Sequence, residues 1–186
     1  MPINNKYLPH YHFIETHSIK IAASQADVMH AVLNYRGDDD AFFKFAIGLR
    51  ELPIRLLDKI TGQQRISKQA FGLDNFTRLE HIEQQELMMG LAGKFWQLNY
   101  GQQPILDAAS FLAFSESDSA KLTLHFWAEK ISDTHTQLTT ETRVFCIDQK
   151  ALSNFRPYWY LIRPVSGLIR KRILMKIQQN CQVQHT

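Results

Sequence analysis

Hydrophobic residues recur at helical spacing through the carboxyl-terminal part of the chain. They follow one another at steps of three, four or seven positions: Leu152, Phe155, Trp159, Ile162, Ile169, Ile173 and Ile177. This spacing is typical of the apolar face of an amphipathic α-helix. Pro164, with Ser166 and Gly167 just beyond it, falls inside this segment, and a proline in a helix interior costs roughly 3 kcal/mol. The pattern predicts a long terminal helix that kinks or breaks near residues 163–167.

The segments before this helix alternate between apolar and polar residues, as strands do. Residues 120–130 and 137–147 form two such runs, and the turn-forming "SDT" lies between them, so we predict a hairpin. Residues 76–98, "FTRLEHIEQQELMMGLAGKFWQL", predict a second pair of strands. Gly90 and Gly93 in its second strand indicate a bulge or a close backbone approach. The sheet is expected to be antiparallel and strongly curved.

The amino-terminal part predicts one strand followed by two helices. The strand covers about residues 10–22, and Ser24 with Asp27 three residues later resembles a capping box at a helix start. A second helix is expected over residues 42–60, bent or split at Pro53, before the polar connection at residues 61–69. The order is therefore strand, two helices, several strands and a long helix, which defines an α+β protein.

Composition limits the class of protein. A chain of 186 residues suits a single domain over residues 1–186, and its 45% hydrophobic and 21% charged residues are ordinary for a soluble globular protein. The net charge of +3 is too small to favour a nucleic-acid partner. Two cysteines and a start without a signal-peptide pattern lead us to expect a reducing compartment, the cytoplasm.

Basic residues accompany the apolar face of the terminal helix. Arg156, Arg163 and Arg170 recur every seventh position, which places them in one row and excludes a membrane-spanning helix. Lys171, Arg172 and Lys176 extend the row. Basic residues near an anionic membrane contribute about 1 kcal/mol each, so transient contact with such a surface or with a partner protein is one hypothesis.

Three stretches carry a resemblance to a known family. They are "GLAGKFW" at residues 90–96, "LTTETRV" at 138–144 and "FRPYWYLIRPVSGLIR" at 155–170. Through them and the order of elements, nearly the whole chain resembles the START-like superfamily, also called SRPBCC or helix-grip. It is most similar to a bacterial branch related to polyketide cyclase/dehydrase-like and lipid-transport proteins, from which no particular activity carries over. The Arg156–Pro157 pair departs from that pattern.

The resemblance implies a curved sheet wrapped around the terminal helix, with a cavity between them. A sheet and one helix diverge along part of their length, and the space stays open unless large side chains fill it. The candidate ligand-binding residues combine apolar and polar groups: Trp96, His125, Glu141, Arg143, Phe155, Trp159 and Ile162.

The polar candidates have two interpretations each. Glu141 and Arg143 share a strand face, so they either form a structural ion pair or point together into the cavity to hold a polar ligand group. His125, on a neighbouring strand, is either an acid or base near neutral pH or a hydrogen-bonded structural histidine.

Other chemistry has little support in the sequence. His10 and His12 fall on one face of the expected strand, but no third metal ligand accompanies them. The consecutive Asp38, Asp39 and Asp40 lack calcium-loop spacing and suit the start of a helix. There is no nucleophile elbow and no phosphate-binding glycine loop, and Cys146 sits among apolar residues. We therefore expect no metal and no cofactor.

These observations leave three functional hypotheses. The first is binding of a hydrophobic small molecule, such as a lipid, an isoprenoid or a polyketide-like compound, between the sheet and the terminal helix. The second is a cyclase- or dehydratase-type enzyme that uses His125, Glu141 or Arg143 inside that cavity. The third is a membrane- or protein-binding surface on the basic helix.

Overall fold

A computed structural model describes residues 3–35, 75–97 and 101–183. Within these residues the core is a curved antiparallel sheet of five strands in the order β1-β5-β4-β3-β2, which does not close into a barrel. The strands are β1 (Phe13–Ile21), β2 (Thr77–Ile82), β3 (Glu86–Gly93), β4 (Ala120–Ser132) and β5 (His135–Cys146). The helices are α1 (Ile3–Tyr7), α2 (Gln25–Leu33), α4 (Ala108–Ala113) and α5 (Gln149–Val183).

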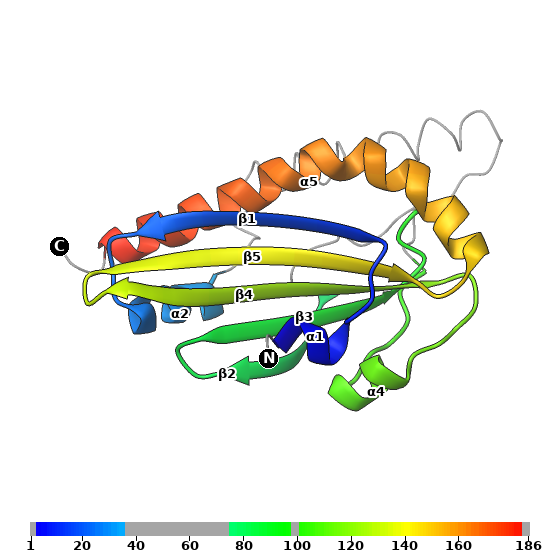
Figure 1. Cartoon of the computed structure of the whole chain (residues 1–186), viewed down its shortest axis with the longest axis horizontal. Helices are drawn as coiled ribbons and strands as arrows, with labels where there is room; N and C mark the ends of the chain where they lie inside the picture. The colour runs from blue at the N-terminus through cyan, green and yellow to red at the C-terminus, as the bar shows by residue number, and fades with distance from the viewer. Residues whose placement is uncertain (1–2, 36–74, 98–100, 184–186) are drawn as a thin grey trace.

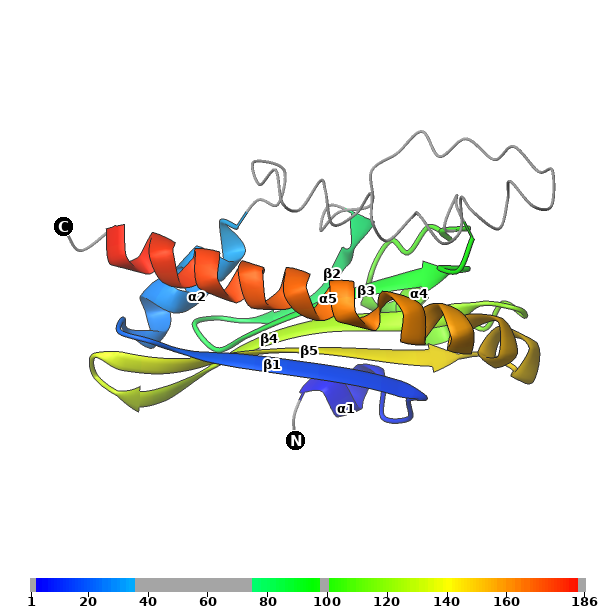
Figure 2. The same cartoon turned by 90° about the horizontal axis from the view of Figure 1, so that it is seen from above.

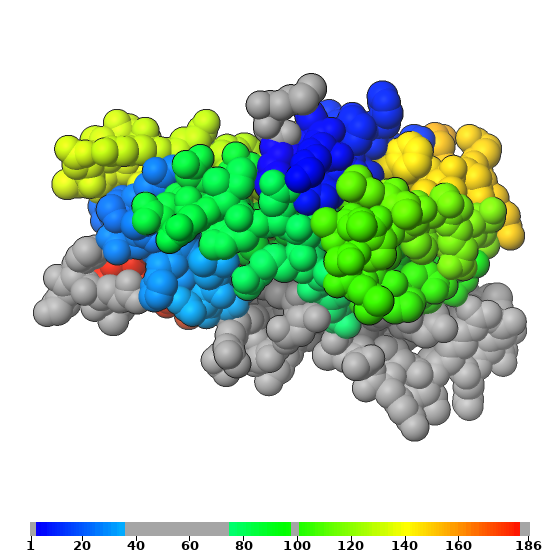
Figure 3. All heavy atoms as spheres, turned by 90° about the horizontal axis from the view of Figure 1, so that it is seen from below, coloured from blue at the N-terminus to red at the C-terminus, as the bar shows by residue number. Residues whose placement is uncertain are grey.

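The two faces of the sheet are covered by different helices. The long helix α5 and the short helix α2 lie on one side of the strands, which we call the inner face, while α1 lies on the other, the outer face (Figure 2). On the outer face α1 and α4 pack over Leu79, Met88 and Ala92. Figure 3 shows the amino-terminal segment, in dark blue, against the green β2–β3 hairpin. This α+β arrangement is consistent with the predicted helix-grip fold.

Helix α5 runs without a break, which differs from one of the two predicted outcomes. It stays helical through Pro157 and Pro164 and arches over the sheet (Figure 1). Both prolines are exposed. The carbonyl groups that lose their helical partner there can therefore turn toward water, which favours a bend over a break. The helix begins at Gln149, so Pro157 does not mark its start.

The inner core consists of two apolar clusters along α5. Phe155, Trp159 and Ile162 belong to the cluster at the amino-terminal end of the helix. Ile173 and Ile177 belong to the cluster at the other end, where α2 also packs.

Several sequence predictions are confirmed with shifted boundaries. The hairpin of β4 and β5 and the pair β2–β3 are present, and the Ser24 hydroxyl caps α2 by accepting from the Asp27 amide at 3.2 Å.

Strand β1 begins at Phe13 and not near residue 10, so His10 and His12 precede the strand and do not share a face of it. The predicted helix over residues 42–60 lies outside the described residues.

Gly90 allows the close approach that the sequence indicated. A Cβ atom at this position would lie 2.6 Å from a Leu79 methyl group and 2.8 Å from the Phe111 ring. Gly93 ends the same strand with a φ of 154°, in the region that favours glycine.

Substituting Gly90→Ala is expected to destabilise the protein by about 1–3 kcal/mol, the usual range for forcing an atom into a packed core. The Phe111 ring is fully buried and has little room to move. Chemical denaturation should therefore show a smaller loss for Gly90→Ala in a Phe111→Leu background, where a smaller aliphatic side chain replaces the ring. Equal losses in both backgrounds would refute this explanation.

Candidate ligand-binding site

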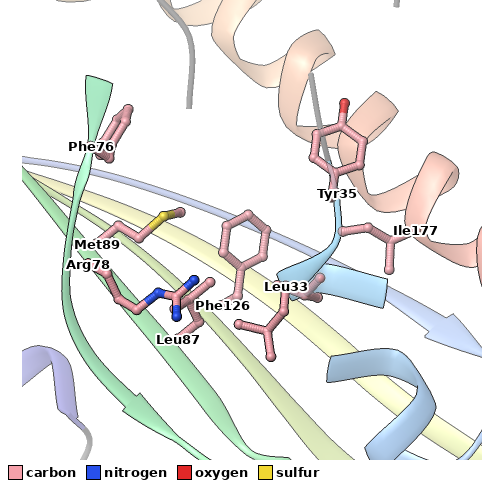
Figure 4. A pocket seen from close by; sticks show the side chains of 9 residues that line it. Leu33, Tyr35, Phe76, Arg78, Leu87, Met89, Phe126 and Ile177 are labelled. Atoms are coloured by element: carbon pink, nitrogen blue, oxygen red, sulfur yellow. The ribbon is translucent and has the colours of Figure 1, made fainter. Parts of the chain in front are cut away.

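A pocket of about 300 Å³ opens between the inner face and the helices α2 and α5. Most of its lining residues are apolar, while Arg78 and Tyr35 bring polar groups to it, and Figure 4 shows the side chains around it. The lining residues are Val32, Leu33, Tyr35, Phe76, Arg78, Leu87, Met89, Phe126 and Ile177. This volume lies at the small end of the range for small-molecule sites.

The seven sequence candidates do not line this pocket. The structure places four of them, the apolar ones, together at the other end of α5. Trp96 and Trp159 both contact the ring of Phe155, at centroid distances of 6.2 and 6.0 Å, and Ile162 lies in the same cluster. Phe13 packs on Phe155 and Trp159 at 5.2 and 5.3 Å. These rings fill the space between helix and sheet at that end.

The three polar candidates meet on the outer face, away from α5. His125 and Glu141 are paired across β4 and β5, and Arg143 donates to Glu141 at 2.7 Å. Helix α1 covers them: Asn4 donates to Glu141 at 2.6 Å, and Arg143 donates to Asn5 at 2.8 Å. The structural ion pair is thus present. Because these groups point to the opposite side of the sheet, they do not enter the space between the sheet and α5.

The arginines of α5 do not reach Glu141. That carboxylate is bound to Arg143 and Asn4 on the outer face, whereas α5 lies on the inner face.

His125 is a buried, neutral histidine within this polar network. The Asn4 amide nitrogen lies 3.2 Å from Nδ1, and since that nitrogen can only donate, Nδ1 accepts and Nε2 carries the hydrogen. Nε2 then donates to Glu86 at 2.8 Å, and the ring stacks on Trp127 at 4.8 Å. Burial, aided by the Arg143 charge, lowers the pKa of His125 to about 4. Burial also raises the pKa of the Glu86 carboxyl. The network pins α1 to the sheet.

The described residues contain no arrangement of side chains that favours metal binding or a reactive thiol. No group of three or more His, Cys, Asp or Glu side chains there is placed to hold a metal ion. His12 accepts a hydrogen bond from the Cys146 amide at 3.1 Å and stacks on Phe145. Cys146 and Cys181 are buried free thiols, and burial raises the pKa of Cys146 to about 12. Asp38, Asp39 and Asp40 lie outside the described residues.

Across the described ranges, 3–35, 75–97 and 101–183, no helix has the length and apolar character that crossing a membrane requires. Comparison of the chain with protein families, curated proteins and solved structures gives no match. The assignment of the fold therefore rests on the strands and helices of this chain alone.

The stability of the protein should depend on pH through His125. Its pKa falls from 6.5 in the unfolded chain to about 4 in the fold, so the unfolded state takes up the proton first. The stabilisation is complete above pH 6.5 and is lost as the pH falls toward 4. The loss is roughly 3 kcal/mol in the free energy of unfolding.

Urea unfolding at pH 7 and pH 4.5 measures this effect. His125→Gln should flatten the pH dependence, whereas His81→Gln, at an exposed position on β2, should leave it unchanged. The same slope in wild type and His125→Gln would show that His125 is not the group responsible.

Proposed function

We propose that the protein binds a hydrophobic small molecule, of the lipid, isoprenoid or polyketide-like kind, between the inner face of the sheet and the helices α2 and α5. The pocket beside Phe126 and Ile177 carries this proposal, because most of the side chains in its walls are apolar and no side chain of the described residues fills it. Burial of apolar surface against such walls contributes about 25 cal/mol per Å².

The open pocket lies at one end of α5 and the packed aromatic cluster at the other. Trp96 and Trp159 both contact Phe155 there, which supports a closed end to the binding space and not its entrance. Membership in the START-like superfamily is part of the proposal. It rests on the three sequence stretches and on a fold that is compatible with it.

Filling the pocket should weaken binding. Met89 lines it, so Met89→Trp should reduce the affinity for the neutral fluorescent probe N-phenylnaphthylamine roughly tenfold, which corresponds to about 1.4 kcal/mol. Ile131→Trp, at an exposed position near the end of β4, is the matched control and should bind as wild type does. Fluorescence titration measures both. Native mass spectrometry of the purified protein would reveal a ligand that remains bound.

Failure of the wild-type protein to bind any neutral apolar probe would contradict the proposed function. Equal binding by wild type and Met89→Trp would show that the ligand sits elsewhere.

A second candidate function is contact with an anionic membrane surface through the outward side of α5. This side exposes large apolar residues, namely Tyr160, Leu161, Leu168 and Met175. Arg156, Arg163 and Lys171 are exposed beside them. An apolar stripe flanked by basic residues is the pattern of a helix that lies in a membrane interface. Such contact is compatible with ligand binding.

Vesicle sedimentation tests the membrane contact. Wild-type protein should sediment with vesicles that contain phosphatidylserine at low salt and remain in solution with phosphatidylcholine alone. Leu161→Glu with Leu168→Glu should abolish sedimentation, while Ile131→Glu, an exposed apolar position on β4, should have no effect. Absence of any preference for anionic vesicles would remove this candidate.

A further inference from the structure

Four polar residues form a cluster on the inner face, directly beneath α5. Glu15 and His17 come from β1, and they pair with Thr142 and Thr140 of β5 in the sheet register. We call them the inner polar cluster. Thr140 and Thr142 are 1% and 3% exposed, and the Glu15 side chain is 8% exposed. None of the sequence candidates falls in this cluster.

Hydrogen bonding in the inner polar cluster is incomplete. Glu15 Oε1 meets His17 Nε2 at 2.9 Å, but Glu15 Oε2 has no partner. The hydroxyl groups of Thr140 and Thr142 also have none. Within the described residues these three are the buried side-chain oxygen or nitrogen atoms without a hydrogen bond, and all three lie together. Buried polar atoms normally find partners, so this concentration indicates a missing group.

Helix α5 approaches the sheet closely at this point. A Cβ atom on Gly167 would lie 2.8 Å from Glu15 Oε1 and 3.6 Å from the His17 ring. The two apolar clusters of the inner core lie on either side of this site. On α5 the last residue of one cluster is Ile162, and the buried residues of the other cluster begin at Ile173. The inner polar cluster therefore interrupts an otherwise apolar interface.

The inner polar cluster shares cross-strand rows with the pocket. One row runs Glu15, Thr142, Leu124, Met89 across β1, β5, β4 and β3. The next runs His17, Thr140, Phe126, Leu87. Met89, Phe126 and Leu87 line the pocket. Neighbouring strands are about 4.8 Å apart, so Thr140 stands one strand from the pocket wall at Phe126.

We propose that the inner polar cluster binds the hydroxyl group of an otherwise apolar ligand whose body occupies the pocket. This inference rests on the proposed function and narrows its ligand to an alcohol. The Glu15 carboxylate only accepts hydrogen bonds, whereas each threonine hydroxyl both donates and accepts. A ligand hydroxyl can donate to Glu15 and accept from a threonine, which satisfies both kinds of group.

Other polar groups complement the inner polar cluster less well. A ligand carboxylate or phosphate would face the Glu15 carboxylate in a poorly hydrated site, where like charges repel strongly. An ammonium group could donate to Glu15 and to the threonine oxygens, but it would lose its hydration on burial and would offer no acceptor to the threonine hydroxyl hydrogens. The three oxygen atoms are covered when no ligand is bound, so α5 must part slightly from the sheet. Pro164, which removes one helical hydrogen bond nearby, makes this easier.

Displacement of N-phenylnaphthylamine from the full-length protein tests the proposal with three matched competitors: decanol, decanoic acid and decylamine. We expect decanol to displace the probe at a concentration about tenfold below that of the other two, the difference expected for one buried hydrogen bond. Thr140→Val with Thr142→Val should remove this preference and leave the affinity for the probe unchanged. Thr139→Val, on the outer face of the same strand, is the control and should keep the preference.

Glu15→Gln provides a second test, in which the expected change is a gain in the binding of decanoic acid. It removes the charge and retains an acceptor, so decanol should still bind while decanoic acid improves about tenfold. Thermal melting checks that each variant is folded.

The possible failures can be told apart. No binding of the probe by wild type would overturn the proposed function and this inference together. Probe binding with a head-group preference that survives both Glu15→Gln and the double valine substitution would overturn this inference alone and would assign the inner polar cluster to buried water.

Discussion

The packing of one helix along a curved sheet governs the rest of this structure. Helix α5 must cover the inner face with a single amphipathic surface, yet an arched helix cannot fit a curved sheet equally well along its whole length. Three environments result. Aromatic rings fill the space near Phe155, polar groups meet Gly167 at the middle, and a pocket remains near Ile177. The pocket thus lies where the complementarity between helix and sheet ends.

The outer face is covered in a different way. A polar network attaches helix α1 to it, and no long apolar helix of the described residues packs there. Asn4 donates to both His125 and Glu141, so one buried amide ties α1 to two strands. His125, Glu141 and Arg143, which the sequence offered as ligand-binding candidates, belong to this network on the outer face. The sheet therefore keeps two polar clusters apart: one is fully bonded on the outer face, and the other is incomplete on the inner face.

The sequence predicted the architecture but not the position of the pocket, for physical reasons. The apolar spacing of α5, the alternation of β5 and the Ser24 cap are local properties, and each was confirmed. The face of β4 was not predictable, because residues 120–128 are almost all buried on both sides and show no alternation. Helix α1 is only five residues long, so nothing revealed that the outer face would be covered at His125. The pocket depends on where α2, β2 and α5 meet, which no short-range pattern specifies. Glu15 and His17 do alternate along a predicted strand, but only the register with β5 shows that they meet two threonines.

The open edge of the sheet has a further consequence. Among the strands that the structure describes, the hydrogen-bonded order runs from β1 to β2 and does not return, so these strands form an open sheet and not a closed barrel. The diameter of a closed barrel is fixed by the number and stagger of its strands. An open sheet can instead curve more or less strongly while all of its strand pairings stay intact. The distance between α5 and the sheet can therefore change without the loss of any strand pairing.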